Sequence, residues 1–344
     1  MGRHVAGELP ELDRLVVDAC AEIGREVDAL CIPRLAGVVL GGGYGRGEGG
    51  AIEQPERTLA LSNDLDFFAV TEDGAPEAES IAAIGRAIGP IAEKWTARLG
   101  VDVDFAVKTP WRLKHDEERI MVQELVRGYF DVAGKKGEEL FAGIARIDAA
   151  KLPWMEAARL LMNRGMGLLF AMVENGESWS PKLELEKGKV PLSNSNSELE
   201  LIRKRDFVNR NINKCVLGAG DARLVARHAY AWRAEERAKA LGDALYSAAV
   251  EWKFRPRAEP VCDWEKAREV WLSSFGEVCD GSMGAKTARN LRNAVRWIVR
   301  RRSIGDLRTF ALDPVVRVLD AVALHVRERR SIDDALMRDW KIFN

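Results

Sequence analysis

The sequence predicts an α+β protein in which a small mixed β-sheet with flanking helices is followed by an α-helical domain. A length of 344 residues is enough for about two domains. Up to about residue 112, short apolar segments alternate with longer amphipathic ones, as strands and helices do. Beyond that point, apolar residues recur every three or four positions almost throughout. We therefore expect one domain at residues 1–112 and a second at residues 113–344.

The composition is typical of a soluble globular protein, with 47% hydrophobic and 31% charged residues. The net charge of −1 hides an uneven distribution, because residues 1–150 carry 17 Lys and Arg against 27 Asp and Glu, and residues 151–344 carry 35 against 26. Such a division suits halves with different roles, halves that attract each other, or a basic face for a polyanion.

The cysteines and the apolar runs exclude several classes of protein. Five scattered cysteines without a C-x-x-C pair, together with only four histidines, argue against a disulfide framework and against a zinc site. The N-terminal residues contain no apolar core of a signal peptide, and no later run is long enough to span a membrane. We expect a cytoplasmic protein with no membrane partner.

The first elements lead to a glycine-rich turn. Apolar residues spaced by three and four predict a helix over residues 11–31, which Pro33 ends, and residues 37–40 form a short buried strand. Seven of the ten residues 41–50 are glycines, which cannot form a stable helix interior. They predict a turn that brings backbone N–H groups close to a ligand and then starts a helix. Residues 51–61 are expected to be a loop.

Two further strands carry acidic residues. Residues 65–70 are apolar between polar neighbours and predict a strand, and residues 77–98 predict a helix that Gly100 ends. Residues 101–107 alternate apolar and acidic side chains, which predicts a third strand with Asp102 and Asp104 on one face.

The remainder is expected to be almost entirely helical. Residues 184–197 are polar and are the best candidate for a flexible loop. Helices are predicted near residues 116–128, 154–174, 197–216, 221–241, 243–253, 263–275, 285–302, 312–330 and 332–340.

The acidic strands are the first candidate for chemistry. Asp64 and Asp66 stand two residues apart on one strand, so their carboxylates share a face, about 6–7 Å apart along the backbone. Two like charges at this separation repel by roughly 2–3 kcal/mol at an effective dielectric near 20. Either water solvates the pair, as at many strand ends, or a cation neutralises it. A third carboxylate, from Asp102 or Asp104, would complete an oxygen-rich site for Mg²⁺.

The glycine run has two other interpretations. Residues 45–50 match G-x-G-x-x-G, but they start several residues beyond the strand, and a dinucleotide site needs one acid at the next strand end instead of two. A Walker P-loop is excluded because no G-K-[ST] follows the glycines.

Residues 40–48, which read LGGGYGRGE, and residues 62–67, which read SNDLDF, together resemble the signature of the DNA polymerase beta-like nucleotidyltransferase superfamily. The resemblance covers roughly residues 36–108 and implies a small mixed sheet with flanking helices. It also implies an NTP held by the glycine turn and two Mg²⁺ or Mn²⁺ ions held by D-x-D and a third acid.

Carried over to this sequence, the resemblance implies a role for each motif residue. Asp64 and Asp66 would bind metal, with Asp104 as the third carboxylate and Asp102 as the alternative. Asp104 is preferred because more strand precedes it and a continuous apolar run follows it. The nucleotide would be contacted by the glycine-turn residues Gly42, Gly43, Tyr44 and Arg46.

The sequence departs from the superfamily pattern in two ways. Gly43 stands where many members have Ser, which removes a hydroxyl from the phosphate site. The separation between Gly43 and Asp64 is also longer than usual, which implies an insertion at about residues 49–61 that covers the nucleotide or shapes the acceptor site.

The implied activity is Mg-dependent transfer of a nucleoside monophosphate from an NTP to a hydroxyl of an unidentified acceptor, a small molecule or a protein. Alternatives are an RNA-modifying or nucleotide-polymerising enzyme and an inactive nucleotide-binding protein on the same scaffold.

Members of this superfamily commonly carry a helical domain that closes over the nucleotide. Here Lys214, just before an expected break at Gly218-Ala-Gly220, is a candidate phosphate contact. A basic helical stripe binds RNA, pairs with the acidic first half of the chain, or is a solvated face. It consists of Lys286, Arg289, Arg292, Arg296 and Arg300.

Overall fold

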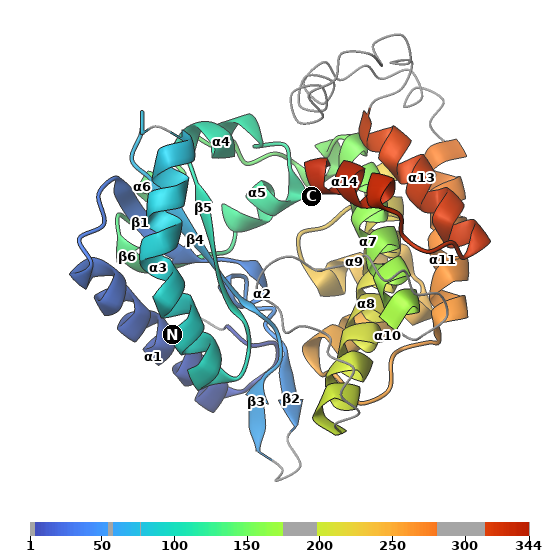
Figure 1. The fold of residues 1–344 in the computed structure, drawn as a ribbon, viewed down its shortest axis with the longest axis horizontal. Coiled ribbons are helices and arrows are strands. Elements are labelled where there is room, and N and C mark those ends of the chain that lie inside the picture. The colour runs from blue at the N-terminus through green and yellow to red at the C-terminus, as the bar shows by residue number, and fades with distance from the viewer. Residues whose placement is uncertain (1–3, 54–57, 76, 175–197, 281–313, 344) are drawn as a thin grey trace. The chain divides into compact units, whose positions relative to one another are not determined.

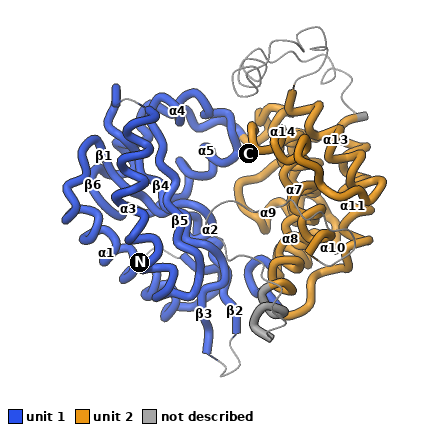
Figure 2. Tube along the Cα trace, viewed as in Figure 1, with its two compact units in different colours: residues 1–148, 253–257 blue, residues 149–252, 258–344 orange. Residues whose placement is uncertain are grey.

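The computed structural model describes residues 4–53, 58–75, 77–174, 198–280 and 314–343. The chain divides into two compact units (Figure 2). The first comprises residues 1–148 and 253–257, and the second comprises residues 149–252 and 258–344. The first unit therefore extends well beyond the expected boundary after residue 112, because the elements from Pro110 onward complete its sheet and cover one of its faces.

The first unit is built on a four-stranded mixed sheet, which confirms the predicted α+β class with a small mixed sheet. The strand order is β5-β4-β1-β6. Strand β1 is antiparallel to both of its neighbours, β4 and β6, and β5 is parallel to β4. The strand bounds are β1 Leu35–Leu40, β4 Leu65–Thr71, β5 Val103–Lys108 and β6 Phe130–Gly134.

Helices cover both faces of this sheet (Figure 1). Because side chains alternate along a strand, Phe67 and Ala69 of β4 join one core, and Phe68 and Val70 join the other. The first core includes residues of α1 and α3, and the second includes residues of α4, α5 and α6. The helix bounds are α1 Pro10–Ala29, α3 Glu77–Leu99, α4 Pro110–His115, α5 Ile120–Leu125 and α6 Gly137–Leu140.

Two further differences from the expected elements lie in the first unit. Residues 51–61 are not a simple loop, because β2 (Ala51–Glu53) pairs antiparallel with β3 (Leu59–Leu61) and buries Ala51 and Leu61. Strand β6 was not predicted, since its five residues carry no distinctive local pattern. The open edge of β1 makes this segment a strand, and tertiary pairing of this kind routinely overrides weak local propensity.

In the described residues the second unit is helical after a short 3₁₀ turn at Ala149–Lys151. The helix predicted over residues 154–174 is confirmed as α7. The bounds are α7 Trp154–Glu174, α8 Glu198–Ala226, α9 Ala234–Leu241, α10 Ala244–Phe254, α11 Trp264–Asp280, α13 Pro314–Glu328 and α14 Asp334–Phe343. The last two residues of α10 belong to the first unit. None of the helices in the described ranges is long and apolar enough to cross a membrane.

The predicted break near Gly218 is wrong. Helix α8 runs without interruption from Glu198 to Ala226, where separate helices over residues 197–216 and 221–241 were expected. The glycines stay helical because neighbours pack tightly against them: a Cβ on Gly218 would lie 2.3 Å from Cγ of Arg164, and one on Gly220 would lie 2.2 Å from the Tyr246 ring. The loop predicted at residues 184–197 and the helix predicted at residues 285–302 lie outside the described residues.

Candidate functional site

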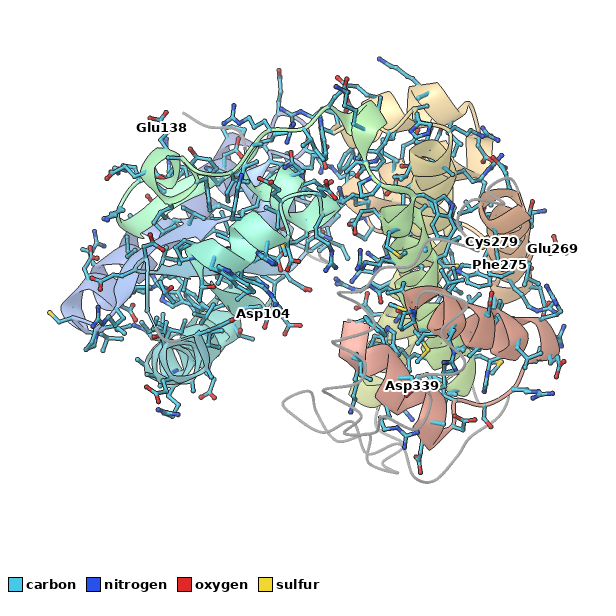
Figure 3. All side chains as sticks on the ribbon, turned by 90° about the horizontal axis from the view of Figure 1, so that it is seen from above. Asp104, Glu138, Glu269, Phe275, Cys279 and Asp339 are labelled. Carbon is cyan, nitrogen blue, oxygen red and sulfur yellow. The ribbon has the colours of Figure 1, made fainter. Side chains whose placement is uncertain are left out.

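Strand pairing brings two of the predicted carboxylates together. Strands β4 and β5 run parallel, and Asp66 is the register partner of Asp104. Paired residues on adjacent strands project from the same face of a sheet, so the two carboxylates are neighbours. Asp64 precedes β4 by one residue and lies two positions before Asp66, which places it in the same row. Asp64 and Asp66 are half-buried. Asp104, which is labelled in Figure 3, is exposed.

The pairing also separates the two candidates for the third carboxylate. Asp102 precedes β5, and its backbone oxygen accepts a hydrogen bond from Leu65 N at 2.9 Å. Asp104 lies within β5, directly opposite Asp66. Asp104 is therefore the better placed of the two to act together with Asp66.

The glycine turn lies against this carboxylate row. Gly41 N donates to the backbone oxygen of Asp66 at 2.8 Å, and α2 (Gly42–Gly45) follows at once. Gly42 has φ +60°, and a Cβ on it would lie 2.1 Å from Oδ2 of Asp66. Position 42 consequently requires glycine, both for its backbone conformation and for its contact with Asp66. The N–H groups of Gly42 and Gly43 open α2, so no carbonyl of a preceding turn of that helix accepts from them.

Tyr44 organises the site from within, in contrast to its expected contact with the nucleotide. Its side chain is fully buried, and its hydroxyl donates to Gly50 O at 2.7 Å. The same oxygen accepts from Ser62 N at 3.2 Å and from Asn63 N at 3.4 Å. Asn63 in turn accepts from Gly50 N at 2.6 Å through Oδ1. Tyr44 therefore ties the glycine turn to the two residues that precede Asp64.

Arg46 also has protein partners where a phosphate contact was expected. Its guanidinium lies 2.9 Å from Oε2 of Glu124 on α5 and 3.7 Å from Oε2 of Glu48, and its side chain is 14% exposed. Glu48 is buried and lies 3.0 Å from Nζ of Lys253. Sequence reasoning missed Glu124 and Lys253 because no local pattern links positions so far apart along the chain.

The remaining predicted contacts lie in the second unit or outside the described residues. Lys214 lies on the exposed side of α8 in the second unit, within an uninterrupted helix. The predicted presentation of its ammonium at a helix break is wrong, because no break exists there. The basic stripe lies outside the described residues, namely Lys286, Arg289, Arg292, Arg296 and Arg300.

The row of carboxylates suits a divalent cation in donor type. Mg²⁺ and Mn²⁺ prefer oxygen ligands, and Asp64, Asp66 and Asp104 supply them from one sheet face. Paired side chains on neighbouring strands generally stand about 5 Å apart, and two carboxylates at that separation repel by about 3 kcal/mol at an effective dielectric near 20, which a cation would relieve. Among the described residues, no three His, Cys, Asp or Glu side chains converge on a point as a formed metal site would require.

No protein-family model, curated protein or solved structure matches the chain significantly. What the protein does is therefore inferred from its own residues and their arrangement. The resemblance of residues 40–48 and 62–67 to the nucleotidyltransferase superfamily stays a prediction.

Proposed function

We propose that the protein is a metal-dependent nucleotidyltransferase that moves a nucleoside monophosphate from an NTP to a hydroxyl of an acceptor, a small molecule or another protein. One observation carries the proposal: Asp66 lies opposite Asp104 in register, beside a glycine turn whose Gly42 backbone contacts the Asp66 carboxylate. A turn with close backbone approach suits phosphates, and a row of carboxylates suits the ions that accompany them.

Each part of the site has a role in this reaction. Asp64, Asp66 and Asp104 would hold Mg²⁺ or Mn²⁺, which when bound would supply charge for the triphosphate and lower the pKa of the acceptor hydroxyl. The N–H groups of Gly42 and Gly43 would donate to phosphate oxygens. The acceptor hydroxyl loses its proton to solvent, and its oxygen bonds to the α-phosphorus. The bond from that phosphorus to the oxygen that bridges to the β-phosphate breaks, and pyrophosphate leaves with that oxygen.

The buried side chain of Tyr44 would fix the position of the glycine turn relative to Asp64. Tyr44 binds the backbone on both sides of the β2–β3 hairpin, at Gly50 and at Ser62 and Asn63. The distance between the phosphate-binding turn and Asp64 is thereby held constant across the hairpin. Metal-assisted transfer depends on such positioning, since a misplacement of about 1 Å can cost about 100-fold in rate.

The test is the Asp64→Asn, Asp66→Asn double variant, assayed with each labelled NTP and Mg²⁺ in cell extract. We expect transfer of label to protein, RNA or a small molecule in the wild type, and a loss of at least about 1000-fold in the variant. The thermal midpoint should stay close to the wild-type value, because asparagine has nearly the same size and shape as aspartate. Asp18→Asn, at an exposed position on α1, is the matched control.

Two results would count against the proposal. Transfer at the wild-type rate by the double variant would show that these carboxylates do not hold the reaction's metal ions. Binding of NTP that does not depend on Mg²⁺, with no pyrophosphate released in any extract, would indicate a nucleotide-binding protein without transfer activity.

A further inference from the structure

Five residues that lie more than one hundred positions after the rest of the first unit in the sequence also belong to that unit. The segment 253–257 joins that unit, although residues 149–252 and 258–344 belong to the second. Its backbone lies against the end of the glycine turn, since a Cβ on Gly50 would stand 2.6 Å from Lys253 O. Arg255 donates through an Nη atom to Ala6 O at 2.6 Å, which fastens the segment to the N-terminal residues.

Lys253 also forms an ion pair with Glu48, a residue of the glycine turn. Its Nζ lies 3.0 Å from Oε2 of Glu48, whose residue surface is only 4% exposed. Arg46, a second cation near Glu48, is more distant: it lies 3.7 Å from Oε2 of Glu48 and is closer to Glu124, at 2.9 Å. A carboxylate so deeply buried needs a close counter-charge, and Lys253 is the nearer of these two cations.

Glu48 is coupled to the phosphate-binding part of the turn through its backbone. Glu48 N donates to Gly43 O at 2.8 Å and so closes the turn on itself. Gly49 N, the next donor, bonds to His4 O at 3.0 Å. A shift of the Glu48 carboxylate toward water would therefore pull on the peptide units of Gly43 and Gly49.

We propose that Lys253 is a positioning residue for the glycine turn. Lys253 holds the Glu48 carboxylate in place and thereby keeps the amides of Gly42 and Gly43 arranged for the triphosphate. The expected effect of Lys253 on nucleotide binding rests on the proposed function, whereas its expected effect on the order of the glycine turn does not. Apparent affinity falls in proportion to the fraction of molecules with a competent turn, so loss of Lys253 weakens NTP binding without removing any direct contact.

The experiment compares Lys253→Met, Lys253→Arg and the control Lys114→Met, which removes an exposed lysine paired with Glu117 in the same unit. In Lys253→Met we expect the KM for NTP·Mg to rise about tenfold with a smaller change in kcat. Lys253→Arg should restore most of the affinity, and Lys114→Met should match the wild type. In the absence of nucleotide, hydrogen exchange at the amides of residues 46–49 should be faster in Lys253→Met only.

A Glu48→Gln background separates positioning from direct contact. Because Lys253 acts through the Glu48 charge, adding Lys253→Met to Glu48→Gln should change neither KM nor exchange further. An equal loss of affinity in that background would overturn the proposal, because it would mean that Lys253 contacts the nucleotide itself. Unchanged exchange at residues 46–49 in Lys253→Met would also overturn it.

The two proposals fail differently. If the wild type neither binds NTP nor transfers label, the proposed function fails, and the exchange measurements still decide the role of Lys253. If the wild type binds NTP and Lys253→Met leaves both exchange and KM unchanged, only the role of Lys253 is lost.

Discussion

Glycine has different uses in the two units of this protein. In the first unit, Gly42 has φ +60° and leaves space in which the Asp66 carboxylate lies against the backbone. In the second unit, Gly218 and Gly220 stay within α8 and leave space for the side chains of Arg164 and Tyr246. In the first unit the missing side chain lets a charged group approach the backbone, and in the second unit it lets helices pack closely.

The contact at Gly220 supports a buried polar cluster. The Tyr246 hydroxyl donates to Asp221 Oδ1, and Arg237 Nε lies 2.9 Å from the same oxygen. Burial, with the Asp221 charge nearby, raises the pKa of Tyr246, so its hydroxyl stays protonated as a donor. A glycine pair in a basic, helical region therefore need not mark a ligand loop, and what surrounds each glycine decides its role.

Among the glycine substitutions, the largest effect is expected for Gly42→Ala. The new methyl group would meet Asp66 and the left-handed backbone would be strained, so we expect nucleotide transfer to fall by at least about 100-fold and the free energy of unfolding to fall by about 1–3 kcal/mol. Label transfer and urea unfolding measure the two effects.

Gly74→Ala is the control for Gly42→Ala. Gly74 has φ +72°, but no atom lies within 4 Å of the place that a Cβ would take there, so this position shares the strain and lacks the contact. Equal loss of transfer in both variants would show that backbone strain alone explains the effect, and the comparison would then break down.

A smaller and purely structural effect is expected for Gly220→Ala. Tyr246 is 1% exposed and cannot move away freely, so the added methyl group should lower the free energy of unfolding by about 1–3 kcal/mol. The KM for NTP should stay at the wild-type value at temperatures where the protein is folded. Chemical denaturation and steady-state kinetics test both statements, and a raised KM would indicate that this helix takes part in nucleotide binding.

The smallest effect is expected for Gly85→Ala. Gly85 lies inside α3, and a Cβ added there would have no atom within 4 Å, so neither a ligand nor a neighbour requires glycine at this position. Alanine has the higher helix propensity and should raise the free energy of unfolding by about 0.5–1 kcal/mol. A higher thermal midpoint with unchanged kinetics would confirm a third class of glycine. A lower midpoint would reveal a contact that the backbone geometry does not indicate.

Much of the first unit could be predicted because its signals are local. The apolar segments that became β1 and β4, and the amphipathic period of α3, can be recognised from neighbouring residues alone. Strand β6 and the β2–β3 hairpin could not be recognised in this way, since short segments become strands through the partners they find.

The candidate site shows the same division. The spacing of Asp64 and Asp66 by two residues is enough to place them on one face, because a strand repeats every two residues. The sequence by itself thus determined the carboxylate pair and the glycine turn. These two features were enough to predict a phosphate and metal site. Only the tertiary structure decided that Asp104 stands opposite Asp66 and that Tyr44 and Arg46 turn inward. The reason is physical: strand register, burial and ion pairing depend on partners brought together by folding. Glu124, which pairs with Arg46, and Lys253, which pairs with Glu48, both lie on distant parts of the chain.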